Sequence, residues 1–177
     1  MNIQSPPPER IPGATRMSEL DPAEHLLVWS FRRWVSGLVD NAGAHWSMAG
    51  AEFDRRLGRA HGSPALAALA RLVTALQAHA TRPITYHRPC CPCLGADEAA
   101  LVGLIAACQR GAWPAARRTA AGLVDEGGIG DLLAAGRTLA RLLAERGERL
   151  GAGRESADDP LGAANGGHPE AVSWWVH

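Results

Sequence analysis

Apolar residues recur every three or four positions along most of the chain, which is the spacing of one face of an α-helix. In the first such segment they are Leu27, Phe31, Trp34, Val35 and Leu38. The segment follows Asp21-Pro22-Ala23-Glu24. This is a typical helix start, because aspartate caps, proline fits the first helical position and a glutamate three residues after the cap can accept the cap amide. A helix is therefore predicted from Pro22 to the polar run that begins at Asp40.

The same spacing predicts five further helices, separated by glycine, proline and polar residues. Their predicted ranges are about 44–57, 63–80, 96–110, 113–126 and 129–146. The turns between them include the glycine-containing segments 58–62 and 127–128. The sequence shows neither an alternation of strands and helices nor an internal repeat. Short connections favour antiparallel neighbours, so the predicted fold class is all-α, a compact five- or six-helix bundle with disordered N- and C-terminal tails.

The two ends of the chain have a different composition from the centre. Residues 1–20 include three consecutive prolines, and residues 148–177 are rich in Gly, Ala, Asp and Glu. We predict a disordered leader over 1–20, a helical domain over 21–147 and a flexible tail over 148–177. The tail carries Trp174-Trp175, and a pair of indoles in a polar segment is typical of docking into a groove on this protein or on another.

Charge and hydropathy exclude several classes of partner. The chain has 18 basic residues, all arginine, and 18 acidic residues, a balance that gives no electrostatic footprint for nucleic acid. The longest apolar stretch, 99–108, is too short to cross a bilayer, and the N-terminal residues lack the apolar region of a secretory signal. We therefore expect a cytoplasmic protein that binds neither membrane nor nucleic acid, with reduced or metal-bound cysteines. The arginine pairs, Arg32-Arg33 among them, are predicted on solvated helix faces.

The segment 82–95 interrupts the helical pattern and holds most of the unusual chemistry. Three prolines make it an irregular loop, and it contains His87-Arg88-Pro89-Cys90-Cys91-Pro92-Cys93. Three thiols within four residues, just before a helix N-terminus, suit a metal ion or an anionic cluster. Asp97-Glu98, in the first turn of that helix, is explained by the positive end of the helix dipole.

Two metal centres fit this loop. Zinc takes four N or S ligands; Cys90 and Cys93 have the spacing of a ligand pair, and the remaining candidates are His87, Cys91 and Cys108, with His79 as a further histidine. An iron–sulfur cluster takes four thiolates, and the chain has four cysteines. Cys108 lies about 18 Å along the following helix, which weakens a site that needs all four. A cluster shared between two chains of a homodimer would avoid this difficulty.

The sequence leaves other interpretations open. Cys90-Cys91-Pro92-Cys93 resembles a redox Cys-x-x-Cys motif without the strand that usually precedes one, and Cys91-Pro92 could ligate haem. Cys108 alone fits a small buried core residue. We expect a small accessory or regulatory protein that is not an enzyme, acts with another protein, and binds zinc or an iron–sulfur centre. The alternatives are a protein–protein adaptor with incidental cysteines and a thiol redox protein.

Overall fold

The structure is a computed structural model that describes residues 16–151. These residues form a short 3-10 helix, Met17–Glu19, and six α-helices. The α-helices are α1 (Pro22–Val39), α2 (Gly43–Leu57), α3 (Arg59–His79), α4 (Ala96–Arg110), α5 (Trp113–Ala121) and α6 (Glu126–Glu145). Over the described range the only β-type pairings are two isolated bridges. The predicted all-α bundle is confirmed. None of the helices between residues 16 and 151 is both long and apolar enough to span a membrane.

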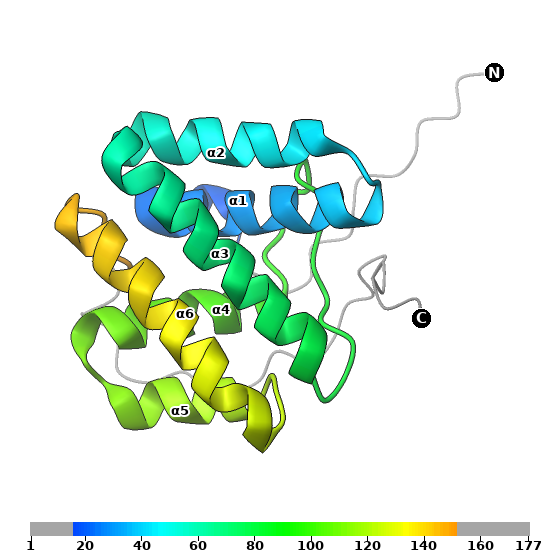
Figure 1. The fold of residues 1–177 in the computed structure, drawn as a ribbon, viewed down its shortest axis with the longest axis vertical. Coiled ribbons are helices and arrows are strands. Elements are labelled where there is room, and N and C mark those ends of the chain that lie inside the picture. The colour runs from blue at the N-terminus through cyan, green and yellow to red at the C-terminus, as the bar shows by residue number, and fades with distance from the viewer. Residues whose placement is uncertain (1–15, 152–177) are drawn as a thin grey trace.

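The helices are arranged around α3. Helices α1 and α2 lie side by side, α3 crosses them, and α6 runs along α3 (Figure 1). Helices α4 and α5 complete the bundle on the side of α6 away from α2, with α4 packed on both α5 and α6. One continuous hydrophobic core runs through all of these contacts. The loop between α3 and α4 leaves the end of α3, passes close to α1 and returns to start α4 (Figure 1).

The start of α1 agrees with the sequence prediction. The Asp21 carboxylate accepts a hydrogen bond from the Glu24 amide at 2.8 Å, and the Glu24 carboxylate accepts one from the Asp21 amide at 3.1 Å. Pro22 occupies the first helical position. The two hydrogen bonds satisfy backbone amides that have no partner within the helix. Pro22 has no amide N–H, so it leaves none unsatisfied at the first helical position.

The predicted turn over 58–62 is wrong, because one residue makes the whole connection. Gly58 adopts φ 75°, a conformation that glycine reaches without strain, and α3 begins at the next residue. Gly62 lies inside α3 against α2. A Cβ at this position would come within 2.7 Å of the Asp54 backbone, so glycine serves the close approach of two helices and not a turn.

The boundary between α5 and α6 also differs from the prediction. Helix α5 ends at Ala121, before the predicted end at residue 126, and Val124 forms an isolated bridge with Ala80. Asp125 then caps α6 by accepting a hydrogen bond from the Gly128 amide at 2.9 Å. The predicted 127–128 turn is therefore the first turn of α6.

The folded domain extends beyond the predicted range 21–147. At one end Met17 and Leu20 are buried in the core, and at the other Leu150 is buried and the Gly151 amide donates to Asp21 at 2.9 Å. The remainder of the predicted leader and tail, 1–15 and 152–177, lies outside the described residues, as does Trp174-Trp175.

Candidate thiol site in the cysteine loop

The loop that carries the cysteines is anchored to the core before it reaches them. Ile84 and Tyr86 are both buried, and they precede His87 in an extended stretch without regular secondary structure. Alternation explains the pattern, since side chains two residues apart in an extended chain point to the same side. The loop therefore enters the thiol region from a fixed position against the bundle.

Arg32 of α1 holds the backbone of the thiol region in place. Its side chain is completely buried, and all five of its N–H donors have acceptors. Nε donates to Glu98 at 2.7 Å and Nη2 donates to the same carboxylate at 2.8 Å. The other donors bind loop carbonyls: Cys91 at 2.7 Å, Arg88 at 3.5 Å, and Cys93.

Glu98 of α4 provides the negative charge opposite Arg32, and all of its hydrogen-bond acceptor positions are occupied. Besides Arg32, its carboxylate accepts the His87 amide at 3.0 Å and the Gly95 amide at 2.8 Å. A carboxylate has room for about four acceptances, and these four bonds fill it. The ion pair is therefore buried with its hydrogen-bonding capacity met, which is the condition under which a buried pair is tolerated.

The prediction that Arg32 lies on a solvated face is wrong. Arg32 follows Val28 by four residues and precedes Val35 by three, so the three side chains share the buried face of α1. This spacing could have predicted that Arg32 is buried. The prediction was not made because arginine is rarely buried without a partner, and the partner, Glu98, is 66 residues away in the sequence.

The helix-dipole explanation of Asp97-Glu98 is incomplete. Asp97 is buried, and it accepts hydrogen bonds from Arg82 at 2.9 Å and from the Thr85 amide at 2.7 Å. Burial favours the neutral acid, but the bonds from Arg82 and Thr85 outweigh it and hold the pKa of Asp97 below its ordinary value. The two adjacent carboxylates thus bind opposite ends of the loop, Asp97 its start and Glu98 its cysteine-bearing end.

The residues just before α1 also bind the thiol region. The Met17 amide donates to the Pro92 carbonyl at 2.7 Å, and Arg16 forms an isolated antiparallel bridge with Cys93. This pairing could not be predicted from the sequence, because neither segment has the alternation of apolar and polar residues that is typical of a strand. The thiol region is consequently held between α1, α4 and the residues that precede α1.

The three loop thiols differ in their surroundings. Cys90 is exposed, whereas Cys91 and Cys93 are half-buried, and the Cys91 thiol is near enough to Cys93 to affect its pKa. Burial, and then the neighbouring Cys91 thiol, raises the pKa of Cys93, and the nearby Arg16 and Arg32 only partly offset this. Cys91 is therefore a close neighbour of Cys93, and the predicted pairing of Cys90 with Cys93 stays a prediction.

The remaining predicted ligands are dispersed. The His87 ring lies beside Gly95, and burial lowers the pKa of His87. Cys108 is buried in the last turn of α4, near Gly136 of α6, and burial raises its pKa. Within residues 16–151, no three His, Cys, Asp or Glu side chains gather closely enough to hold a metal ion.

Comparison of the chain with protein-family models, curated proteins and solved structures found no match. The chemistry of the loop is therefore the basis for a functional proposal. It presents two half-buried thiols near each other and a third, exposed thiol in the adjacent residue, on a backbone fixed by buried hydrogen bonds.

Proposed function

We propose that the protein is a small metal-binding regulatory protein whose cysteine loop takes up a thiophilic metal ion. The observation that carries this proposal is a loop with three thiols in four residues whose backbone is fixed by the buried Arg32 and Glu98, with the Cys91 thiol near Cys93. Thiolates select zinc, copper(I) and iron–sulfur centres over hard cations. A pair of thiols held together before the metal arrives loses little conformational freedom on binding it.

Zinc is the favoured metal. Cys91 and Cys93 would be its first two ligands, and Cys90 and His87 would complete the set of four. Cys90 is exposed, so its side chain can change rotamer without breaking core contacts. The imidazole of His87 would need to turn away from Gly95.

An iron–sulfur centre built on four thiolates of one chain receives less support. Cys108 lies at the opposite end of α4 from the loop, roughly 18 Å along the helix axis at 1.5 Å per residue. A centre that uses only the three loop thiols of each of two chains would not need Cys108. That arrangement implies a homodimer that forms with its metal.

The alternative roles draw on other features. A redox role would need an activated thiolate, and the raised pKa of Cys93 does not favour one.

An adaptor role would use exposed apolar side chains, and Leu38, Val39 and Met48 are between 37% and 43% exposed at the α1–α2 end of the bundle. An adaptor would keep its partner when the loop thiols are removed, and a metal-dependent regulator would not.

The test is elemental analysis of the full chain, purified anaerobically without a metal-affinity column. We expect about one zinc per chain, lost in Cys91→Ser/Cys93→Ser and retained in the control Cys108→Ser. Iron with acid-labile sulfide, retained in the same control, would identify the loop-only cluster instead. A wild-type protein that takes up neither zinc nor iron, and whose four thiols all titrate freely once it is unfolded, would overturn the proposal.

A further inference from the structure

A second surface feature lies at the other end of α4, away from the cysteine loop. It is a groove of about 590 Å³ between the end of α4, the start of α5 and the outer face of α6. Its lining residues are Cys108, Gln109, Trp113, Arg137, Arg141 and small side chains of α6. The metal-site proposal uses no part of this groove.

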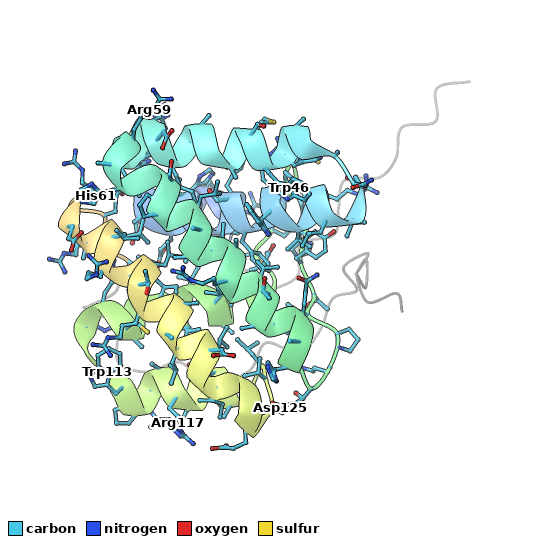
Figure 2. All side chains as sticks on the ribbon, viewed as in Figure 1. Trp46, Arg59, His61, Trp113, Arg117 and Asp125 are labelled. Carbon is cyan, nitrogen blue, oxygen red and sulfur yellow. The ribbon has the colours of Figure 1, made fainter. Side chains whose placement is uncertain are left out.

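The groove combines an aromatic wall with a cationic rim. Trp113 is 46% exposed, and Figure 2 shows it at the edge of the molecule where α5 begins. The Arg137 guanidinium lies 5.4 Å from the centre of the Trp113 ring, and Arg141 stands one helical turn further along α6. The floor is formed by Ala134, Ala140 and Ala144. Small side chains leave room there for large apolar groups. Arg141 also pairs with Glu145 at 2.6 Å, so Arg137 contributes most of the positive charge that favours a ligand with acidic residues.

The described chain ends beside this groove. Gln109, a groove residue, donates to the Glu148 carbonyl at 2.8 Å and accepts the Leu150 amide at 2.9 Å. Gly151 follows directly, next to Arg110. The described chain therefore ends one residue beyond a direct contact with a groove residue, so a segment attached there is tethered close to the groove.

The composition of residues 152–177 matches what the groove offers. The segment has one arginine, Arg154, and four carboxylates, Glu155, Asp158, Asp159 and Glu170. Because the whole chain has 18 basic and 18 acidic side chains, the other residues carry the opposite excess of three positive charges. The segment also holds two indoles, Trp174 and Trp175, which lie between Val172 and Val176.

We propose that residues 152–177 of the same chain dock in this groove. Trp174 and Trp175 pack against Trp113 and the alanine floor, and the acidic residues of the segment lie toward Arg137 and Arg141. The intervening 22 residues, 152–173, can span up to about 70 Å, so reach does not restrict the contact. The inference is independent of the metal proposal, and either can fail alone.

Cys108 supplies the readout, because it lines the groove and is only 7% exposed. We would measure the rate at which iodoacetamide alkylates Cys108 in the full chain, by mass spectrometry of the Cys108 peptide. Trp174→Ala/Trp175→Ala is expected to increase this rate by at least about fivefold. Arg137→Glu, which reverses a groove charge, is compared by hydrogen exchange and not by alkylation, because Arg137 itself lowers the pKa of Cys108 and its loss would slow the reaction of the thiol. Leu161→Ala, in the same segment, is the matched control and should leave the rate unchanged.

Hydrogen exchange separates loss of docking from loss of stability. In the tryptophan variant, faster exchange confined to residues 134–144 and the start of α5 supports docking. Faster exchange throughout the domain would overturn the docking proposal, and so would exchange that is unchanged at every residue. The rates are repeated over a hundredfold range of protein concentration. Protection that strengthens with concentration would mean that a second copy supplies the segment, which would also overturn docking within one chain.

Discussion

A buried arginine needs every one of its N–H donors satisfied inside the protein, and Arg32 meets this need largely with backbone oxygens. Three of its acceptors are carbonyls of the cysteine loop, and only Glu98 contributes a side chain. Arg32 thus converts a loop without secondary structure into a defined surface. The sequence placed the thiols correctly on a loop before a helix but did not identify Arg32, because its contacts are with residues far along the chain.

Replacing Arg32 by alanine should be among the most damaging single substitutions. It leaves Glu98 buried without a counter-charge and removes the donor for three carbonyls, so we expect a loss of about 3–5 kcal/mol in the free energy of unfolding, measured with urea. Arg55→Ala is the control, because Arg55 is 64% exposed in its ion pair with Glu52 and its loss should leave the free energy of unfolding nearly unchanged. Equal losses for the two variants would contradict the structural role of Arg32.

At the scale of the helices, the sequence predicted the boundaries correctly where residues close together in the chain determine them. The Asp21 cap and the apolar stripe fixed the start of α1, and the prolines of 82–95 fixed the longest loop. Glycine was misread at two positions, since its role there depends on a neighbouring helix. Gly62 lies against Asp54 of α2, and Gly128 lies against His79 at the end of α3. Such contacts are settled by packing, which a single sequence does not reveal.

The two nearby glycines of α6 test this explanation. A Cβ at Gly128 would overlap the Cβ of His79, whereas a Cβ at Gly130 would meet no other atom within 4 Å. Gly128→Ala should therefore destabilise the protein by about 1–3 kcal/mol, because α3 and α6 must separate. Gly130→Ala should stabilise it by up to about 1 kcal/mol, because alanine is the better helix former. Thermal unfolding of the two variants provides the comparison, and effects of the same sign would refute the packing explanation.

At the scale of the whole molecule, the two ends of the described chain meet. Arg56 of α2 pairs with Glu148 at 2.6 Å, Leu150 enters the core, and Gly151 donates to the residue that caps α1. The sequence predicted a tail from residue 148 because glycine and charged residues dominate there. Apart from the bond between the Glu148 amide and the Leu143 carbonyl, the contacts that tie 148–151 to the domain involve single side chains, which leave no periodic pattern in the sequence.

Leu150→Ala measures how much the packing of residues 148–151 contributes to the stability of the domain. The side chain is 5% exposed, so we expect a loss of about 2–4 kcal/mol in the free energy of unfolding. Arg149→Ala, at an exposed neighbouring position, should change it by no more than about 0.5 kcal/mol. If Leu150→Ala behaved like its neighbour, residues 148–151 would belong to the tail, as the sequence suggested.

The way in which Arg32 binds the loop has a consequence for how the thiols can change. Arg32 recognises the carbonyls of residues 88, 91 and 93, a group that every amino acid carries in the same place. The fold therefore places little constraint on which side chains stand at these positions. Serine, histidine or aspartate could replace the cysteines while the loop kept its course, so the chemistry displayed here can be exchanged by mutation without rebuilding its support.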